Sequence, residues 1–262
     1  MSEESEYMHG HFSEIAAAYR GLRTTDVAPI RFIAEQLVDY PAITAADIGY
    51  GTGRYDLLLF RHLSNLCLTC IDMNSEMLAQ LSRHLAENGI RDFETRVASV
   101  GEMRIDDESL DCVFTFNAVH HFDFPTFLCK AGRAVRKNGE IFVYTRTPDQ
   151  NSRSIWGQHF PDFSSKERRL FDQEQMEAWV HETEGLRLVA VKTFRYRRIS
   201  SLDRLLTQVS GKHYSTFSLY TEEELERAFG AFEAELKRRF KRSERVEWYD
   251  ENVMLQIRRT GT

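Results

Sequence analysis

Three glycines at alternate positions are the most informative feature of the sequence. They stand in the run Ala46-Asp-Ile-Gly-Tyr-Gly-Thr-Gly-Arg54, at the expected junction of a strand and a helix. Glycine lets a backbone approach a ligand closely, and the start of a helix offers unsatisfied N–H groups. Asp47 precedes the first glycine, where a carboxylate suits a cationic amino-acid ligand and would repel a pyrophosphate. The spacing Gly49-x-Gly51-x-Gly53 also differs from the GxGxxG of nicotinamide-binding enzymes, which disfavours an oxidoreductase.

A second acid closes the next expected strand. Asp72 lies in Cys70-Ile-Asp-Met-Asn74, where its carboxylate can accept hydrogen bonds from both hydroxyls of a ribose. Met73 can lie against the face of an adenine. The structural alternative for Asp72 is a helix N-cap, although Asn74 is better placed for that task. The pattern therefore predicts a nucleoside site at Asp72 and Met73, with Asn74 as the cap.

The elements that must position these residues alternate between strand and helix. Apolar strands are expected at 45–49, 66–71, 93–98, 111–117 and 140–145, with helices at 55–63, 75–87 and 125–136 between them. A sixth strand is expected at 186–196 and an antiparallel last strand at 246–258. This alternation predicts a Rossmann-like, doubly wound α/β fold with a mostly parallel seven-stranded sheet.

The motifs together resemble those of the class I S-adenosylmethionine-dependent methyltransferases. The similarity rests on Asp47 to Gly53, on Asp72-Met73 and on the helix start Ser75-Glu-Met-Leu78. The stretch 96–119 and the turn Ala134-Val-Arg-Lys-Asn-Gly-Glu-Ile-Phe142 are similar to that family as well, so the resemblance spans roughly residues 30–145. It implies that S-adenosylmethionine is the cofactor.

The resemblance also implies a role for each matching residue. The turn after the first strand would bind the methionine moiety, and Asp72 the ribose. Ser99 and Val100 would lie at the adenine, and Asn117 would close over the methionine end. The expected contacts of the turn are Asp47, Gly49, Tyr50, Gly51 and Gly53. Ser99 departs from the family, which often has an acid there, so the adenine amino group would meet a hydroxyl without a charge.

Two adjacent histidines follow the fourth strand in Asn117-Ala-Val-His-His-Phe122. In the family this position faces the acceptor, and an imidazole can take a proton from an acceptor O–H, N–H or S–H. His121 is the candidate base, and His120 is a second candidate or a residue that orders the loop. Methyl transfer also gains much of its rate from positioning alone, so a packing role remains open for both.

The N-terminal segment offers two further cofactor residues. A helix is expected at 13–20, with Phe12 before it, Tyr19 on it and Arg23 after it, and small-molecule members of the family resemble this pattern. Tyr19 would cover the methyl-donor region, and Arg23 would pair with the methionine carboxylate. The alternative is an ordinary amphipathic helix whose aromatic residue lies in the core.

We expect a single domain over residues 1–262, with a helical N-terminal cap at 1–40 and a cofactor-binding core at 41–147. Segments 148–172 and 197–220 lack a clear period and are interpreted as insertions that cap the active site, outside the core. Further helices are expected at 27–39, 173–183, 201–209 and 221–240. The insertions mix arginine with aromatic residues, which suits a flat or anionic acceptor, although most of the arginines could equally be solvated. The expected acceptor contacts are Arg146, Trp156, Phe160 and Arg197.

Composition limits the partners. The chain of 262 residues has a net charge of -6, which disfavours broad nucleic-acid binding. No apolar run is long enough to span a bilayer, and the first residues lack a secretory signal, so we expect a cytoplasmic protein without a membrane partner. Four cysteines are too few for a disulfide scaffold and are expected to be buried free thiols, and no metal site is predicted.

The main hypothesis is a methyltransferase that moves a methyl group to a small-molecule acceptor by in-line displacement. An RNA or protein methyltransferase is the first alternative and would need a broad basic face. The basic run Lys237–Arg242 is explained as well by cations at a helix C-terminus. A non-catalytic S-adenosylmethionine-binding protein is the second alternative, and the sequence does not specify the oligomeric state.

Overall fold

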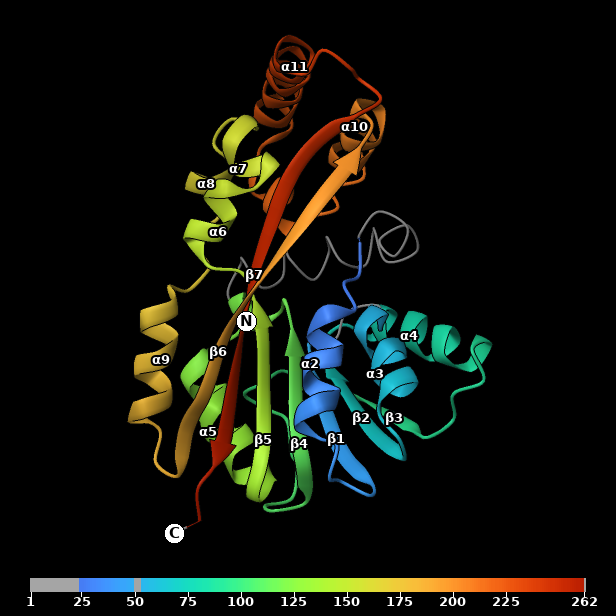
Figure 1. The fold of residues 1–262 in the computed structure, drawn as a ribbon, viewed down its shortest axis with the longest axis vertical. Coiled ribbons are helices and arrows are strands. Elements are labelled where there is room, and N and C mark those ends of the chain that lie inside the picture. Colours follow the sequence, from blue (N-terminus) through green and yellow to red (C-terminus); the bar gives the residue numbers. More distant parts are fainter. Residues whose placement is uncertain (1–23, 50–52, 262) are drawn as a thin grey trace. The chain divides into compact units, whose positions relative to one another are not determined.

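A computed structural model describes residues 24–49 and 53–261 (Figure 1). The expected helix at 13–20 and the expected site residues Tyr19, Arg23, Tyr50 and Gly51 lie outside this range. The strands are β1 Ile43–Ile48, β2 Leu66–Asp72, β3 Phe93–Val97, β4 Leu110–Phe116, β5 Val135–Thr145, β6 Leu186–Ser200 and β7 Val246–Arg259. The α-helices are α2 Ala28–Gln36, α3 Arg54–His62, α4 Ser75–Glu87, α5 Phe124–Ala134, α6 Pro148–Arg153, α7 Ile155–His159, α8 Phe163–Lys166, α9 Gln173–Glu182, α10 Leu202–Ser210 and α11 Glu222–Arg239. Short 3-10 helices are η1 Val119–His121 and η2 Ser215–Leu219.

Within the described part of the chain the strands form one seven-stranded sheet of order β3-β2-β1-β4-β5-β7-β6. Pairing is parallel between β1 and β2, β2 and β3, β1 and β4, and β4 and β5, whereas β7 runs antiparallel to β5. The order reverses beside β1, because the chain builds outward to β3 and then returns to β4. Open α/β sheets bind ligands at such a reversal, beyond the carboxyl ends of the strands. The expected Rossmann-like sheet with an antiparallel last strand is confirmed.

The chain divides into two compact units. Of the described residues, unit 2 contains 25–49, 53–145, 173–192 and 253–261, and unit 1 contains 146–172 and 193–252. Strands β6 and β7 each contribute one half to each unit. Both segments expected to be insertions, 148–172 and 197–220, belong to unit 1.

Unit 2 has its core on both faces of the parallel strands. Strand β4 buries nearly all its residues, as a strand between two helical layers does. Helix α4 turns Met77, Leu81 and neighbouring apolar residues inward. It begins at the N-cap Asn74, whose side chain accepts the N–H groups of Glu76 and Met77, so the expected cap is confirmed. Gly89 follows the helix with φ +76°, the left-handed conformation typical of a helix end.

Two element boundaries differ from the sequence expectation. The helix expected at 27–39 ends at Gln36, and Val38, beyond its end, is exposed. The chain turns there, with the Tyr40 N–H donating to the Leu37 carbonyl. Strand β5 begins at Val135 rather than at residue 140, and the expected Asn138-Gly139 turn is a register shift within its pairing to β4.

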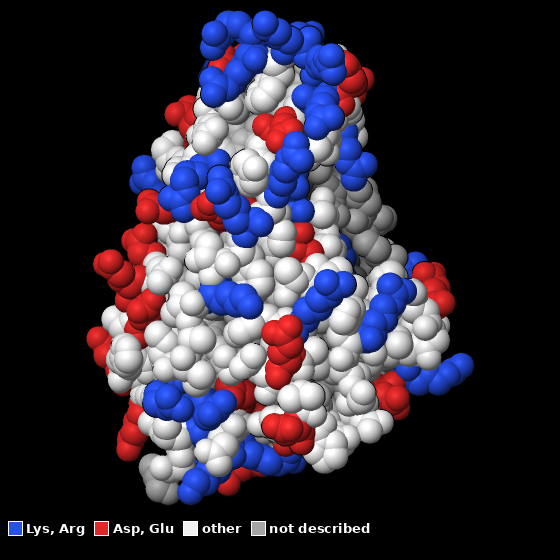
Figure 2. All heavy atoms as spheres, viewed as in Figure 1, with Lys and Arg blue, Asp and Glu red and all other residues white. Residues whose placement is uncertain are grey.

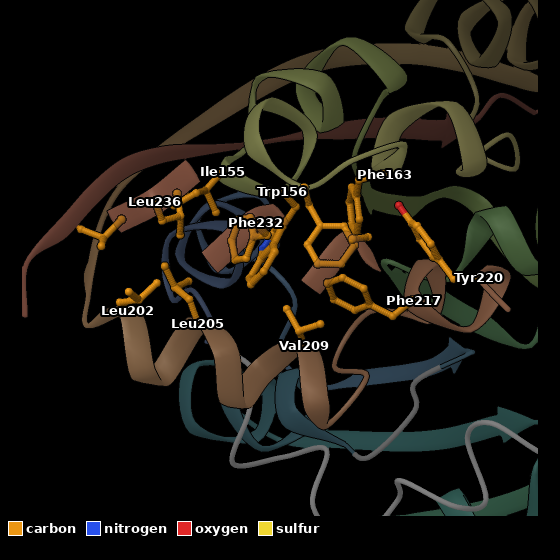
Figure 3. Packing of buried hydrophobic residues seen from close by; sticks show 13 residues of the cluster. Ile155, Trp156, Phe163, Leu202, Leu205, Val209, Phe217, Tyr220, Phe232 and Leu236 are labelled. Carbon is orange, nitrogen blue, oxygen red and sulfur yellow. The ribbon is translucent and has the colours of Figure 1, made fainter. Parts of the chain in front are cut away.

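Unit 1 has an apolar core of its own (Figure 3). Trp156 is 2% exposed and its ring lies 5.2 Å from that of Phe232 and 5.5 Å from that of Phe217. Phe160 and Phe163 are equally buried in this cluster. The expectation that residues 148–170 lie outside a core was therefore wrong for these aromatic residues. They share no helical period because they lie on the short helices α7 and α8 and the turn between them, which pack against α10 and α11.

We predict that Trp156→Ala lowers the free energy of unfolding by about 3–5 kcal/mol, because it removes a large side chain from a closed core. Urea denaturation followed by circular dichroism measures the change. Ile199→Ala is the matched control on the exposed surface of the same unit and should change stability by less than about 0.5 kcal/mol. A neutral Trp156→Ala would contradict the core assignment.

Candidate functional site

Two glycines let the turn after β1 pack closely against the neighbouring elements. Gly49 has φ +73°, and a Cβ added to it would lie 2.6 Å from the Cβ of Ala118, beyond the end of β4. Gly53, the N-cap of α3, has φ +71°, and a Cβ there would lie 2.2 Å from Cδ1 of Leu81 on α4. A side chain at either position would strain the backbone, and one at Gly53 would also require the Leu81 side chain to shift. The N–H of Gly49 donates to the Ile71 carbonyl at 2.8 Å, which ties the turn to the end of β2.

Asp47 is enclosed directly beneath this turn. It is 0% exposed on β1, where its register neighbours are Cys70 on β2 and Phe114 on β4. Neither of its carboxylate oxygens has a hydrogen-bond partner in the described part of the chain. Burial, followed by the charges of Asp56 and Asp72, raises the pKa of Asp47 well above its usual value. A buried carboxylate without a hydrogen-bond donor is unfavourable in isolation, so Asp47 is suited to binding a cation.

Asp72 ends β2 beside the same turn. Its carboxylate Oδ1 accepts the N–H of Asn74 at 2.9 Å, which orients the side chain at the strand end, and both Asp72 and Met73 are half-buried. Asn74 performs the capping, so Asp72 is not used as the cap of α4. An oriented carboxylate at this edge fits the recognition of a diol.

The end of β4 completes this edge of the sheet. Asn117 has φ +54°, and its N–H donates to the Tyr144 carbonyl at 2.7 Å. The next residue, Ala118, is the one that limits space at Gly49. Because β1 pairs with both β2 and β4, the carboxyl ends of three neighbouring strands present Asp47, Asp72 and Asn117 along one edge.

Comparison with known proteins bears on this arrangement. The family model described as "Methyltransferase domain" matches residues 45–139. That range contains the glycine turn and all three strand ends. Residues 45–139 therefore match a methyltransferase domain. The resemblance noted in the sequence is thereby confirmed.

Solved structures with this fold are distant in sequence. A putative methyltransferase from an antibiotic biosynthesis pathway of Anabaena variabilis is 18% identical, with a TM-score of 0.66 over 89% of this chain and 98% of that chain. Geranyl diphosphate C-methyltransferase from Streptomyces coelicolor is 16% identical, with a TM-score of 0.53 over 88% of this chain and 76% of that chain. A [4+2]-cyclase is 13% identical, with a TM-score of 0.60 over 90% and 81%. At these identities the likeness shows the fold alone, and no curated protein sequence matches the chain.

The methyltransferase family often has an acid at the position of Ser99. Here an acid, Glu102, contacts Ser99 instead. The hydroxyl of Ser99 donates to Oε2 of Glu102 at 2.7 Å, and this hydrogen bond lowers the pKa of Glu102. The hydroxyl oxygen of Ser99 keeps its lone pairs for a donor. Val100, beside it, is buried. Sequence reasoning missed Glu102, which lies three residues past the expected position.

The two histidines of the methyltransferase domain lie together on η1. Their ring centroids are 4.0 Å apart, and both side chains are half-buried. The N–H of His121 donates to the Ala118 carbonyl at 2.8 Å, which ties the pair to the residue that packs on Gly49. The structure therefore brings His120 and His121 to the strand-end edge, as the sequence predicts.

The expected acceptor residues all lie in unit 1, in three different settings. Trp156 and Phe160 belong to the closed core. Arg197 is exposed and bidentate to Glu247, at 2.6 and 2.8 Å, a surface ion pair that explains its presence. Arg146 is largely buried, with its guanidinium 3.4 Å from Asp250 Oδ1. Of the four, Arg146 has the setting most compatible with ligand binding.

Unit 1 also contains a hollow of about 280 Å³. Its lining is charged and aromatic, with acids beside the cations, and includes none of the four expected acceptor residues. Among the lining residues are Arg153, His159, Arg195, Tyr249 and Glu251. Burial, with a smaller contribution from Arg239, lowers the pKa of His159.

The cysteines are divided between core and surface. Cys70 and Cys112 are buried, as expected, whereas Cys67 and Cys129 are exposed, so the expectation of four buried thiols was wrong for these two. Residues three apart on a strand point to opposite faces, which separates Cys67 from Cys70. Among the residues that the structure describes, no cluster of His, Cys, Asp and Glu suits a metal ion, and no helix has the length and apolarity to cross a bilayer.

We predict that Gly49→Ala costs more stability than Gly89→Ala, although both glycines have nearly the same φ, +73° and +76°. Gly89 has open space around a Cβ and should lose only the left-handed backbone term of about 1–2 kcal/mol. Gly49 adds an overpacking cost of about 1–3 kcal/mol. Urea denaturation compares the two variants. Adding Ala118→Gly should restore part of the Gly49→Ala loss, and equal losses in both single variants would refute the close approach.

Proposed function

We propose that the chain transfers the methyl group of S-adenosylmethionine to a small-molecule acceptor. The observation that carries the proposal is the shared strand-end edge. There, two positive-φ glycines and a buried carboxylate without a hydrogen-bond partner in the described chain lie beside the oriented Asp72. One half of this site suits a cationic amino acid and the other a ribose. S-adenosylmethionine joins both groups in one molecule.

Each residue of the edge receives a role from this proposal. The methionine end is bound by Asp47, Gly49, Tyr50, Gly51 and Gly53, and Asp72 binds the ribose hydroxyls. Met73, Ser99 and Val100 hold the adenine, with Glu102 orienting the Ser99 hydroxyl. Asn117 closes over the methionine end. Tyr19 and Arg23 of the N-terminal segment are retained as proposed contacts from the sequence.

When bound, the cofactor supplies a methyl group on a positively charged sulfur. The acceptor atom forms a bond to this methyl carbon while the carbon–sulfur bond breaks, and its electron pair remains on sulfur. An acceptor O–H, N–H or S–H must also lose its proton. His121 is the proposed proton acceptor, with His120 as its neighbour at 4.0 Å between ring centroids.

A small molecule is the proposed acceptor class. The Streptomyces coelicolor enzyme of this fold was crystallised with geranyl-S-thiolodiphosphate and S-adenosyl-L-homocysteine, both small molecules. The net charge of -6 supports this choice over a nucleic acid. We propose Arg146 as the acceptor contact, since a largely buried guanidinium is suited to an anionic or flat molecule. The cytoplasmic location expected from the sequence stays a prediction.

An RNA acceptor has one feature in its favour, a basic end of unit 1. Figure 2 shows Lys and Arg side chains gathered over α10 and α11. Acids of α11 pair with two of these cations, Lys237 with Glu233 and Arg238 with Glu235, each at 2.7 Å. Cations in the last turn also stabilise the helix end itself. These pairs support a solvated helix end over an RNA-binding face.

We predict that Asp72→Ala weakens S-adenosylmethionine binding by about 10- to 100-fold, because hydrogen bonds to a charged group contribute about 1.5–3 kcal/mol. Isothermal titration calorimetry measures the affinity, and circular dichroism checks the fold. Asp107→Ala, which removes an exposed acid paired with Arg133, is the matched control and should bind normally. Unchanged affinity in Asp72→Ala would contradict the ribose site.

We predict that His121→Ala lowers turnover by about 100-fold or more while cofactor affinity stays near normal, since general bases contribute about that much. The acceptor is first identified by a methyl-transfer screen of metabolite pools read by mass spectrometry. Single-turnover rates then compare His121→Ala with His120→Ala. Full activity in His121→Ala would remove this residue as the base, and no transfer to any small molecule would count against the proposed acceptor class.

A further inference from the structure

Two buried carboxyl groups meet at Cys70 in the interior of unit 2, because Cys70 is the register neighbour of Asp47 and donates to Asp56. Asp47 on β1 and Asp56 in the first turn of α3 are both 0% exposed. Oδ2 of Asp56 lies 3.4 Å from the position that a Cβ on Gly53 would take, so this carboxyl lies against the turn proposed to bind the cofactor. Buried acids are rare unless they are paired with a cation or a proton.

The surroundings of the pair supply almost no donors. The thiol of Cys70 donates to Oδ1 of Asp56 at 3.7 Å. Within the described chain, both oxygens of Asp47 and Oδ2 of Asp56 have no hydrogen-bond partner. Ionised carboxylates only accept hydrogen bonds, so two of them cannot satisfy each other. A single proton held between them supplies a side-chain hydrogen bond to oxygens that have no partner in the described chain.

A like charge faces the pair from β2. Asp72 raises the pKa of Asp47, whereas the Cys70 thiol donates to Asp56 and favours its charged form. On β4, the register neighbour of Asp47 is the uncharged Phe114. Burial raises the pKa of Asp56 to about 7, and burial also raises the pKa of the Cys70 thiol, which keeps it a donor. Burial and like charge together therefore oppose full ionisation of the pair.

We propose that Asp56 is a positioning residue that keeps one proton on the Asp47–Asp56 pair in the free protein, and that binding of the cofactor's ammonium group drives this proton into solvent. The inference rests on the proposed function for the bound state, because it places that ammonium group at Asp47. In the free protein the shared proton offsets burial of two like charges. In the complex the ammonium group takes over that task. Cofactor affinity then rises with pH, by at most tenfold per pH unit below the titration of the free pair.

Calorimetry of cofactor binding tests the linkage. Titrations of S-adenosylmethionine into the full chain between pH 5.5 and 7.5, in buffers of different ionisation enthalpy, count the protons released. We expect close to one proton per cofactor at the lower end of this range, with affinity rising with pH. Asp56→Asn should release almost none and bind with nearly constant affinity, because its amide donates permanently to Asp47. Asp107→Asn, the exposed control, should behave as the native chain. Equal proton release in Asp56→Asn and the native chain would overturn the proposal.

The free protein gives a second test that needs no cofactor. A carboxyl pKa raised in the folded state means that the folded chain binds more protons than the unfolded chain between about pH 4 and pH 7. The free energy of unfolding should therefore fall as pH rises through this window, and Asp56→Asn should flatten the fall relative to Asp107→Asn. The infrared C=O band of a protonated carboxyl should also be present in the native chain near neutral pH and disappear above the titration, which requires no variant.

The two tests separate the inference from the proposed function. If the free protein shows the carboxyl band and the pH-dependent stability but does not bind S-adenosylmethionine, the shared proton stands and the proposed function fails. If the cofactor binds without proton release and the band is absent, the shared proton is refuted and the proposed function stands.

Discussion

The structure of the site depends on one close approach between two backbones. Gly49 lies so near Ala118 that a Cβ added to Gly49 would lie only 2.6 Å from the Cβ of Ala118. This contact joins the turn after β1 to the chain beyond β4, where the strand order of the sheet reverses. The two segments carry the residues that matter, Asp47 on one and the histidine pair on the other. A wider turn would separate the proposed methyl-donor end of the site from its proposed base.

Features that depend on neighbours in sequence could be predicted from sequence alone. The strand–turn–helix around Gly49 and Gly53 and the cap Asn74 each involve residues within a few positions of one another. The strand order then follows from the family and from the alternation of elements. By contrast, the burial of Asp56 depends on β1 and β2, and an acid in the first turn of a helix is ordinary in any sequence. Glu102 is hidden in the same way, because only the loop geometry brings it to Ser99.

The apolar core of unit 1 could not be predicted from the sequence for a related reason. This core contains Trp156, Phe217 and Phe232, which lie on separate helices. These residues are up to 76 positions apart in the sequence. No helical or strand periodicity marks such a cluster in the sequence. The mixture of arginine and aromatic residues was therefore interpreted as the lining of a ligand pocket. The structure divides them, with the aromatic residues closing the core and most arginines in ion pairs. Arg146 and Asp250 are buried together, a pairing that sequence spacing gives no means to see.

Burial of Asp47 beneath the turn lowers stability but suits the binding of a cation. Its neighbours on β1, Ala46 and Ile48, are apolar and buried, and an apolar residue at position 47 would avoid the cost of a buried charge. A fixed lysine or arginine beside Asp47 would also remove that cost, but it would compete with a cationic ligand for the same oxygens. A proton is the one counter-charge that can leave without any rearrangement of the core. A second buried carboxyl, held against the turn at Gly53, provides such a proton while keeping the site open to a cation. The cost of burying two acids is therefore concentrated where a ligand can offset it.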